Sequence, residues 1–178
     1  DPEIRCKAAR LLNKDPAETA SIRRQIVTSR LTTGLLAPRQ PDGTLPGHPY
    51  KKWDGAHWVL AQLADQGYPP GDESLIPLRE QVLSWLLSEY HLSTVQTING
   101  RTRRCASMES NAIYALLTLE LADARVDELV RRLLMWQWPD GGWNCDRNPD
   151  AHISSFHESW IPLRALSLYA KLKNDKTV

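Results

Sequence analysis

Apolar residues recur along this chain at the three- and four-residue spacing of amphipathic helices. The spacing predicts helices over residues 2–13, 16–33, 53–65, 75–90, 107–121, 126–136 and 159–172. No stretch alternates polar and apolar residues for long enough to indicate a half-buried strand. The pattern therefore predicts an all-α protein.

Helix starts and loops are marked by capping residues and prolines. Asp15 precedes a proline, which is typical of an N-cap followed by the first helical position. Ser74 is expected to cap the helix that follows it. The segment Glu73–Arg79 is echoed by Glu158–Arg164, which predicts another helix start with a serine cap and a first-turn proline. Residues 35–52 are rich in Pro, Gly and Asp and predict a loop.

Three loops share a glutamine followed, a few residues later, by a glycine. They are Gln40–Gly43, Gln96–Gly100 and Gln137–Gly141. Each follows an amphipathic segment and precedes a more uniformly apolar one. The sequence therefore predicts an outer helix, a Gln/Gly corner and an inner helix, repeated three times.

Composition excludes several classes of protein. Lys and Arg number 22 against 21 for Asp and Glu, so no charge excess points to nucleic acid or an anionic membrane. No apolar run reaches the ~20 residues of a membrane span, and no signal-peptide pattern is present. Three sparse cysteines argue for a reducing, cytoplasmic location. The chain begins at Asp1, so we expect a processed chain or part of a longer one.

The segment Gln137–Trp143 resembles the Gln/Trp repeat of squalene–hopene-type terpenoid cyclases and of protein prenyltransferase β-subunits. Those proteins are α/α toroids, in which an inner ring of helices lies within an outer ring around a cavity. As an architecture the resemblance covers about residues 15–172, and it implies that residues 1–178 form one toroid-like domain, about half of a full ring. Self-association, or pairing with the missing half, would then cover the apolar inner face.

The chain departs from both catalytic patterns of these families. It has no Asp-x-Asp-Asp acid, and in place of Asp-x-Cys followed by His it has Cys145 and Asp146 adjacent, with His152 and His157 after them. The resemblance therefore implies the fold and a cavity for an apolar or amphipathic molecule, without either catalytic apparatus. We expect no cofactor.

Polar residues gather where the three inner helices are expected to begin. As acids and bases the sequence predicts Asp54, His57, Glu109, Asp146, His157 and Glu158. As pocket walls or substrate contacts it predicts Trp53, Trp58, Cys105, Trp143, Cys145 and Trp160. Helix capping explains Glu109 and Glu158 equally well. The basic run Arg101–Arg104 is typical of a solvated corner and, less often, of an anion clamp.

A metal site is an open alternative. Cys145, Asp146, His152 and His157 offer ligand types that zinc accepts, and Cys105 or His57 could join from other repeats. Their spacing matches no strong zinc signature, so we expect no tightly bound zinc.

Three functions remain open at this level. The first is a cyclase- or prenyltransferase-like toroid that binds or transforms an isoprenoid-like molecule at a polar mouth. The second is a carbohydrate-active α/α barrel with carboxylates as acid and base. The third is a non-catalytic helical module whose polar corners only cap helices. The residues do not decide whether the protein is an enzyme.

Overall fold

The protein is described by a computed structural model covering residues 1–174. Helices account for 59% of the chain and strands for 4%, so the protein is predominantly helical, as predicted. The chain divides into two compact units. The first comprises Asp1–Val82 with Thr118–Leu121, and the second Leu83–Leu117 with Ala122–Val178. No helix among residues 1–174 has both the length and the hydrophobicity needed to cross a bilayer.

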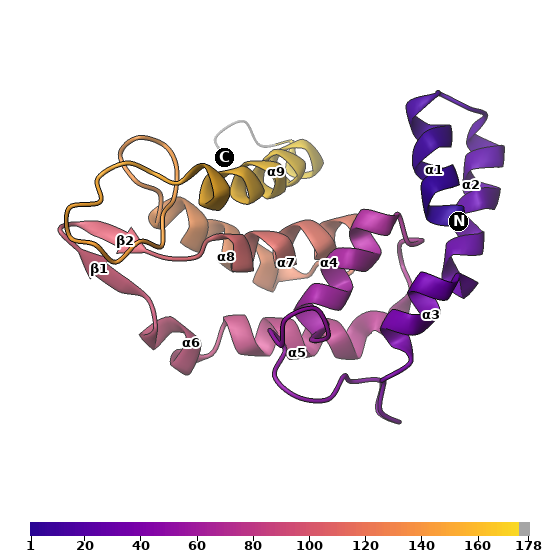
Figure 1. Cartoon of the computed structure of the whole chain (residues 1–178), viewed down its shortest axis with the longest axis horizontal. Coiled ribbons are helices and arrows are strands. Elements are labelled where there is room, and N and C mark those ends of the chain that lie inside the picture. Colours follow the sequence, from indigo (N-terminus) through magenta and orange to yellow (C-terminus); the bar gives the residue numbers. More distant parts are fainter. Residues whose placement is uncertain (175–178) are drawn as a thin grey trace. The chain divides into compact units, whose positions relative to one another are not determined.

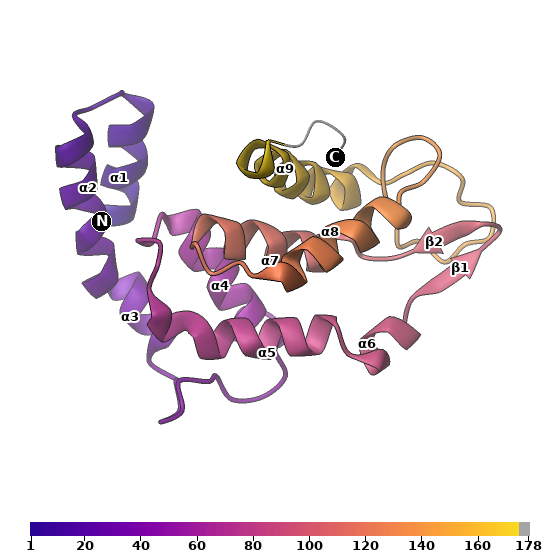
Figure 2. The same cartoon turned by 180° about the vertical axis from the view of Figure 1, so that it is seen from behind.

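The first unit is built from short helices around an aliphatic core. Its elements are α1 (Pro2–Leu11), α2 (Pro16–Gln25), the 3-10 turn η1 (Ile26–Thr28), α3 (Arg30–Leu36), α4 (Ala56–Gln66), the 3-10 turn η2 (Glu73–Leu75) and the start of α5 (Ile76–Leu86). Helices α1 and α2 form an antiparallel hairpin (Figures 1 and 2). The core includes Ile26, Leu60, Leu63 and Leu78, all at most 1% exposed.

The second unit contains the longest helix and the two strands. Its elements after the end of α5 are α6 (Glu89–Ser93), β1 (Gln96–Ile98), β2 (Arg101–Arg103), α7 (Ser107–Thr118), α8 (Ala124–Met135) and α9 (Phe156–Lys173). Both views show α9 alongside α7 and α8 (Figures 1 and 2). The buried faces of these helices carry Ile113, Leu116, Leu129, Leu133 and Ala165.

The helix predicted over residues 16–33 is interrupted. Asp15 caps it as expected, with its carboxylate accepting the Ala17 N–H at 3.0 Å. The interruption lies at Ser29, whose backbone is extended and whose hydroxyl accepts the Thr32 N–H at 3.1 Å. Because a serine side chain can bond nearby backbone groups, it ends one helix and starts the next.

Two further helix starts differ from the expectation. The cap before α5 is Asp72, whose carboxylate accepts the Ser74 N–H at 2.9 Å, so Ser74 does not cap the helix. The helix predicted from residue 53 begins at Ala56 because Trp53 has a left-handed φ of 73°. An αR helix cannot include such a residue.

The predicted corner at Gln96–Gly100 is a β-hairpin. Strands β1 and β2 pair antiparallel, with Gln96 opposite Arg103 and Ile98 opposite Arg101. Asn99 and Gly100 form the two-residue turn, both with positive φ. Asn-Gly is the strongest short-range signal for such a turn, whereas three-residue strands are too short to show alternation.

The other two corners have the same backbone hydrogen bonds. In each Pro-Asp-Gly turn, the residue before the proline donates its N–H to a carbonyl four residues later at 2.8 Å. The glycine N–H then donates to the carbonyl of that first residue at 2.9 Å. The matching hydrogen bonds pair Gln40 with Trp138, whereas the sequence comparison paired Gln40 with Gln137, one residue earlier. Leu45 and Trp143, both buried, then occupy equivalent places.

The echoed segments mark the helices on which these two corners rest. The Gln81 side chain bonds both the N–H and the carbonyl of Leu45, at 2.9 and 2.8 Å, from α5. The Ser159 hydroxyl accepts the Trp143 N–H at 3.0 Å, from α9. The second echo is not a helix start, however, because α9 begins at Phe156 and contains Pro162 in its interior.

Candidate functional site

Two thiols and a carboxylate converge in the second unit. The Cys105 and Cys145 sulfurs and a Glu158 carboxylate oxygen all lie within 4.8 Å of one another, and each residue is partly buried. Cys105 lies between β2 and α7, Cys145 follows the buried Trp143, and Glu158 is in the first turn of α9. The structure thus groups three of the residues predicted for the site.

Hydrogen bonds next to each member hold this cluster in place. The Arg104 N–H donates to the Asn144 carbonyl at 3.0 Å, which joins the segments that carry the two cysteines. The Ser107 N–H donates to Oε2 of Glu158 at 3.2 Å, and the other carboxylate oxygen lies 3.7 Å from the Cys145 sulfur. The three side chains are therefore positioned by backbone contacts and not only by one another.

The three groups of this cluster each carry a negative charge once they lose a proton. Burial, contact with Cys145 and the Glu158 carboxylate together raise the pKa of the Cys105 thiol to about 12. The nearby Arg104 charge acts in the opposite direction without offsetting these effects, so at neutral pH the thiol of Cys105 is protonated.

A cavity of about 250 Å³ opens beside the two cysteines. Its lining is Thr94, Arg103, Arg104, Cys105, Met108, Cys145 and Arg147. Two of the three arginines, Arg103 and Arg104, are buried, so the solvated-corner interpretation is wrong for them. A positively lined, half-enclosed cavity suits an anionic group.

Arg103, at the wall of this cavity, has hydrogen-bonding capacity to spare. It is 4% exposed, its guanidinium lies 4.5 Å from the centre of the Trp138 ring, and Nη2 donates to the Ala151 carbonyl at 3.0 Å. Its Nε and Nη1 have no hydrogen-bond partner among residues 1–174. Buried donors are almost always paired, so these N–H groups point to a ligand.

Glu109 belongs to a buried charged cluster with His91 and Arg104. The carboxylate is 0% exposed, lies 2.6 Å from Nη2 of Arg104 and 3.1 Å from Nε2 of His91, and Arg104 also contacts His91. Burial opposes ionisation, but the hydrogen bond with His91 and the charge of Arg104 outweigh it and lower the pKa of Glu109. Glu109, in the first turn of α7, thus holds Arg104 at the cavity wall, and its fully buried carboxylate does not line an open mouth.

The remaining predicted residues of this unit differ in exposure. Asp146 is exposed and its carboxylate accepts the Asn148 N–H at 2.9 Å, whereas His157 is exposed beside the Phe156 ring. Trp143 is 1% exposed and donates its ring N–H to the Leu133 carbonyl at 2.9 Å. Trp160 is 57% exposed and stacks on Phe156.

Four predicted residues lie in the first unit. Asp54 is exposed and pairs with Lys51 at 3.0 Å. His57 is buried, with its ring against Tyr50, while Trp53 is exposed and lies 4.9 Å from the Trp58 ring. His57, Trp53 and Trp58 form an aromatic group with Tyr50 within that unit.

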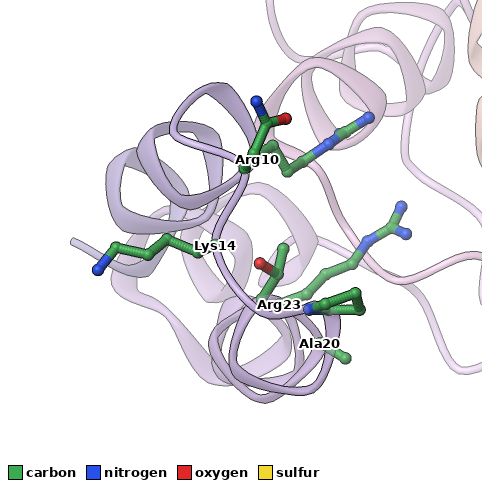
Figure 3. A pocket seen from close by; sticks show the side chains of 7 residues that line it. Arg10, Lys14, Ala20 and Arg23 are labelled. Carbon is green, nitrogen blue, oxygen red and sulfur yellow. The ribbon is translucent and has the colours of Figure 1, made fainter.

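A second cavity of about 420 Å³ lies against α1 and α2 in the first unit (Figure 3). Figure 3 shows Arg10 and Arg23 extending to one side and Lys14 to the other. Arg23 already donates to the carbonyls of Gly67 and Tyr68 at 2.9 and 3.0 Å. Its guanidinium serves the fold, so this cavity is the weaker candidate for a ligand.

His91 and the role of Arg103 were missed by sequence reasoning. His91 lies in a short polar segment with no motif, and only the basic run at residues 101–104 signalled an anion site. Comparison with protein-family models, with curated proteins and with solved structures finds no match for this chain.

Proposed function

We propose that the protein binds, or binds and transforms, an amphipathic, isoprenoid-like small molecule that carries an anionic group. The observation that carries this proposal is Arg103, buried at 4% exposure beside the cysteine-lined cavity with two unpaired N–H groups. A phosphate or diphosphate oxygen would satisfy those donors, and Arg147 at the same wall adds positive charge.

An apolar surface near the cluster supports the apolar part of the ligand. Phe156 and Trp160 stack at an interplanar angle of 19°, and both are largely exposed. They lie on the first turns of α9, which also provides Glu158. Exposed stacked aromatic rings bind apolar chains well, so the first turns of α9 offer a surface for the apolar tail, while Arg103 and Arg147 would contact the anionic head.

The arrangement of the helices as a toroid is part of this proposal. The two Pro-Asp-Gly corners with matching hydrogen bonds, each resting on a helix with the echoed segment, support a repeat of one structural unit. A ring built from such repeats would bring the polar corners to one mouth of a cavity.

The carbohydrate-active alternative has less support. Glycoside hydrolysis uses two carboxyl groups about 5–9.5 Å apart with room for sugar between them. Glu109 cannot serve as one of them, because its carboxylate is fully buried against Arg104 and His91. A helical module whose polar corners only cap helices predicts no ligand binding that depends on Arg103.

Isothermal titration calorimetry with farnesyl diphosphate, farnesol and inorganic diphosphate tests the proposal. We expect the diphosphate ester to bind more tightly than either half alone. Arg103→Gln should weaken its binding about 10- to 100-fold, because a hydrogen bond to a charged group contributes about 1.5–3 kcal/mol and 1.4 kcal/mol is tenfold.

Arg101→Gln is the matched control. Arg101 lies on the same strand and over the same Trp138 ring, at 5.7 Å, but is not part of the cavity lining. Equal losses in both variants would show a nonspecific charge effect, and absence of binding to the wild type would refute the proposal.

A further inference from the structure

We propose that Cys105, Cys145 and Glu158 bind one zinc ion, with the fourth coordination position open to the cavity. The inference goes beyond the proposed function, because it rests only on the positions of three ligand groups. If the protein binds zinc but no small molecule, the zinc inference still holds.

The ligand positions match the size of a zinc coordination shell. Zinc binds sulfur at about 2.3 Å and carboxylate oxygen at about 2.0–2.2 Å, so neighbouring ligands of a tetrahedral ion lie about 3.5–3.8 Å apart. The Cys145 sulfur lies 3.7 Å from Oε1 of Glu158, and all three ligand atoms lie within 4.8 Å of one another. Shifts of less than an ångström would complete three corners of the tetrahedron.

The chemistry of the ligands favours zinc over harder cations. Two thiolates select zinc and other soft ions, whereas magnesium and calcium require oxygen ligands throughout. A pair of thiolates with one carboxylate carries three negative charges, and a divalent ion removes two of them. Arg104 lines the same cavity but its charge is paired with Glu109, so the positive charge at this wall that faces the remainder comes from Arg103 and Arg147.

The site is held together independently of the metal. The bond from Arg104 N–H to the Asn144 carbonyl fixes the residues next to both cysteines, and the bond from Ser107 N–H fixes Glu158. Preformed ligand positions lower the ordering needed when the ion binds. Cys105, Cys145 and Glu158 come from three separate segments, so their spacing along the sequence does not show that they lie together.

Three protein ligands leave one position vacant in a four-coordinate zinc site, as catalytic zinc sites do. Both cysteines line the cavity of about 250 Å³, so the vacant position faces that space. Water or an anionic oxygen of a ligand would complete the shell there. Neither Asp146 nor His157 is needed, which separates this set from the ligands considered along the sequence.

Metal analysis of the full chain, purified under reducing conditions in zinc-containing medium, tests the site. We expect about one zinc per chain after dialysis against metal-free buffer. Cys105→Ser, Cys145→Ser and Glu158→Gln should each lower that content at least several-fold. Cys6→Ser is the matched control, because Cys6 is a buried cysteine of the first unit, and it should keep its zinc.

Cobalt titration of the zinc-free wild type gives a test that needs no variant. We expect a thiolate-to-cobalt charge-transfer band and the visible absorption of tetrahedral cobalt at one equivalent, and protection of two of the three thiols against a thiol reagent. Reduced, folded protein without zinc and without these bands would overturn the inference, as would isolation with a Cys105–Cys145 disulfide.

Arg103→Gln separates this inference from the proposed function. That variant should keep its zinc while losing affinity for farnesyl diphosphate. Zinc in a protein that binds no diphosphate ester refutes the function alone, and diphosphate binding without zinc refutes the metal site alone.

Discussion

Replacing Trp143 by alanine should destabilise the second unit rather than selectively alter ligand binding. The ring is 1% exposed, and its N–H donates to the Leu133 carbonyl at 2.9 Å. That carbonyl also accepts the Trp136 N–H at 3.2 Å, so it is not left without a donor. The loss is therefore dominated by the cavity, and truncating a buried Trp costs about 3–5 kcal/mol.

Thermal and urea unfolding followed by far-ultraviolet circular dichroism measure this loss. For a chain of this size, about 1 kcal/mol shifts the melting temperature by roughly 2–4 °C, so Trp143→Ala should melt about 6–20 °C below the wild type. Trp160→Ala is the control, because that ring is 57% exposed on α9, and its stability should change by no more than about 0.5 kcal/mol.

A Trp143→Ala protein that melts with the wild type would refute this reasoning. The ring would then face open space and would be a wall of a pocket, as the sequence alone also allowed. A changed denaturant slope together with an unchanged midpoint would equally contradict a simple loss of core packing.

Two other changes test the charged cluster and the first corner. Glu109→Gln should lower stability at pH 7 by about 3–5 kcal/mol by leaving Arg104 buried without its counter-ion. Because the pKa of Glu109 is lowered in the folded state, its contribution is complete above the ordinary Glu value and is lost as pH falls through the lowered one. The difference in urea midpoint between wild type and Glu109→Gln should therefore be smaller at pH 3 than at pH 7. An equal difference at both pH values would contradict this. Gly43→Ala should cost about 1–3 kcal/mol in thermal melts, because φ is +82° and a Cβ would lie 2.8 Å from Cγ of Pro77. Gly47→Ala has φ of +85° with nothing within 4 Å, so an equal loss there would show that contact with Pro77 is unimportant.

The sequence determined the features that depend on neighbours along the chain. Helical periodicity gave the all-α class, and Asp15 before a proline gave the start of α2, because capping bonds reach only two or three residues. The break at Ser29 and the Asn-Gly hairpin also have local causes. Each of these causes involves only one or two residues. At Ser29, the apolar spacing of the longer stretch predicted one continuous helix and hid the break.

Tertiary structure decided the composition of the site. Cys105, Cys145 and Glu158 come from three segments, and bonds between distant segments, such as Arg104 to Asn144 and Ser107 to Glu158, bring them together. Burial likewise assigned opposite roles to similar residues. Arg103 keeps unpaired donors at a cavity, whereas the Glu109 carboxylate, predicted at an open mouth, is closed off by Arg104. The sequence specifies the type and charge of each residue. The burial of a side chain and its hydrogen-bond partners depend on groups distant along the chain.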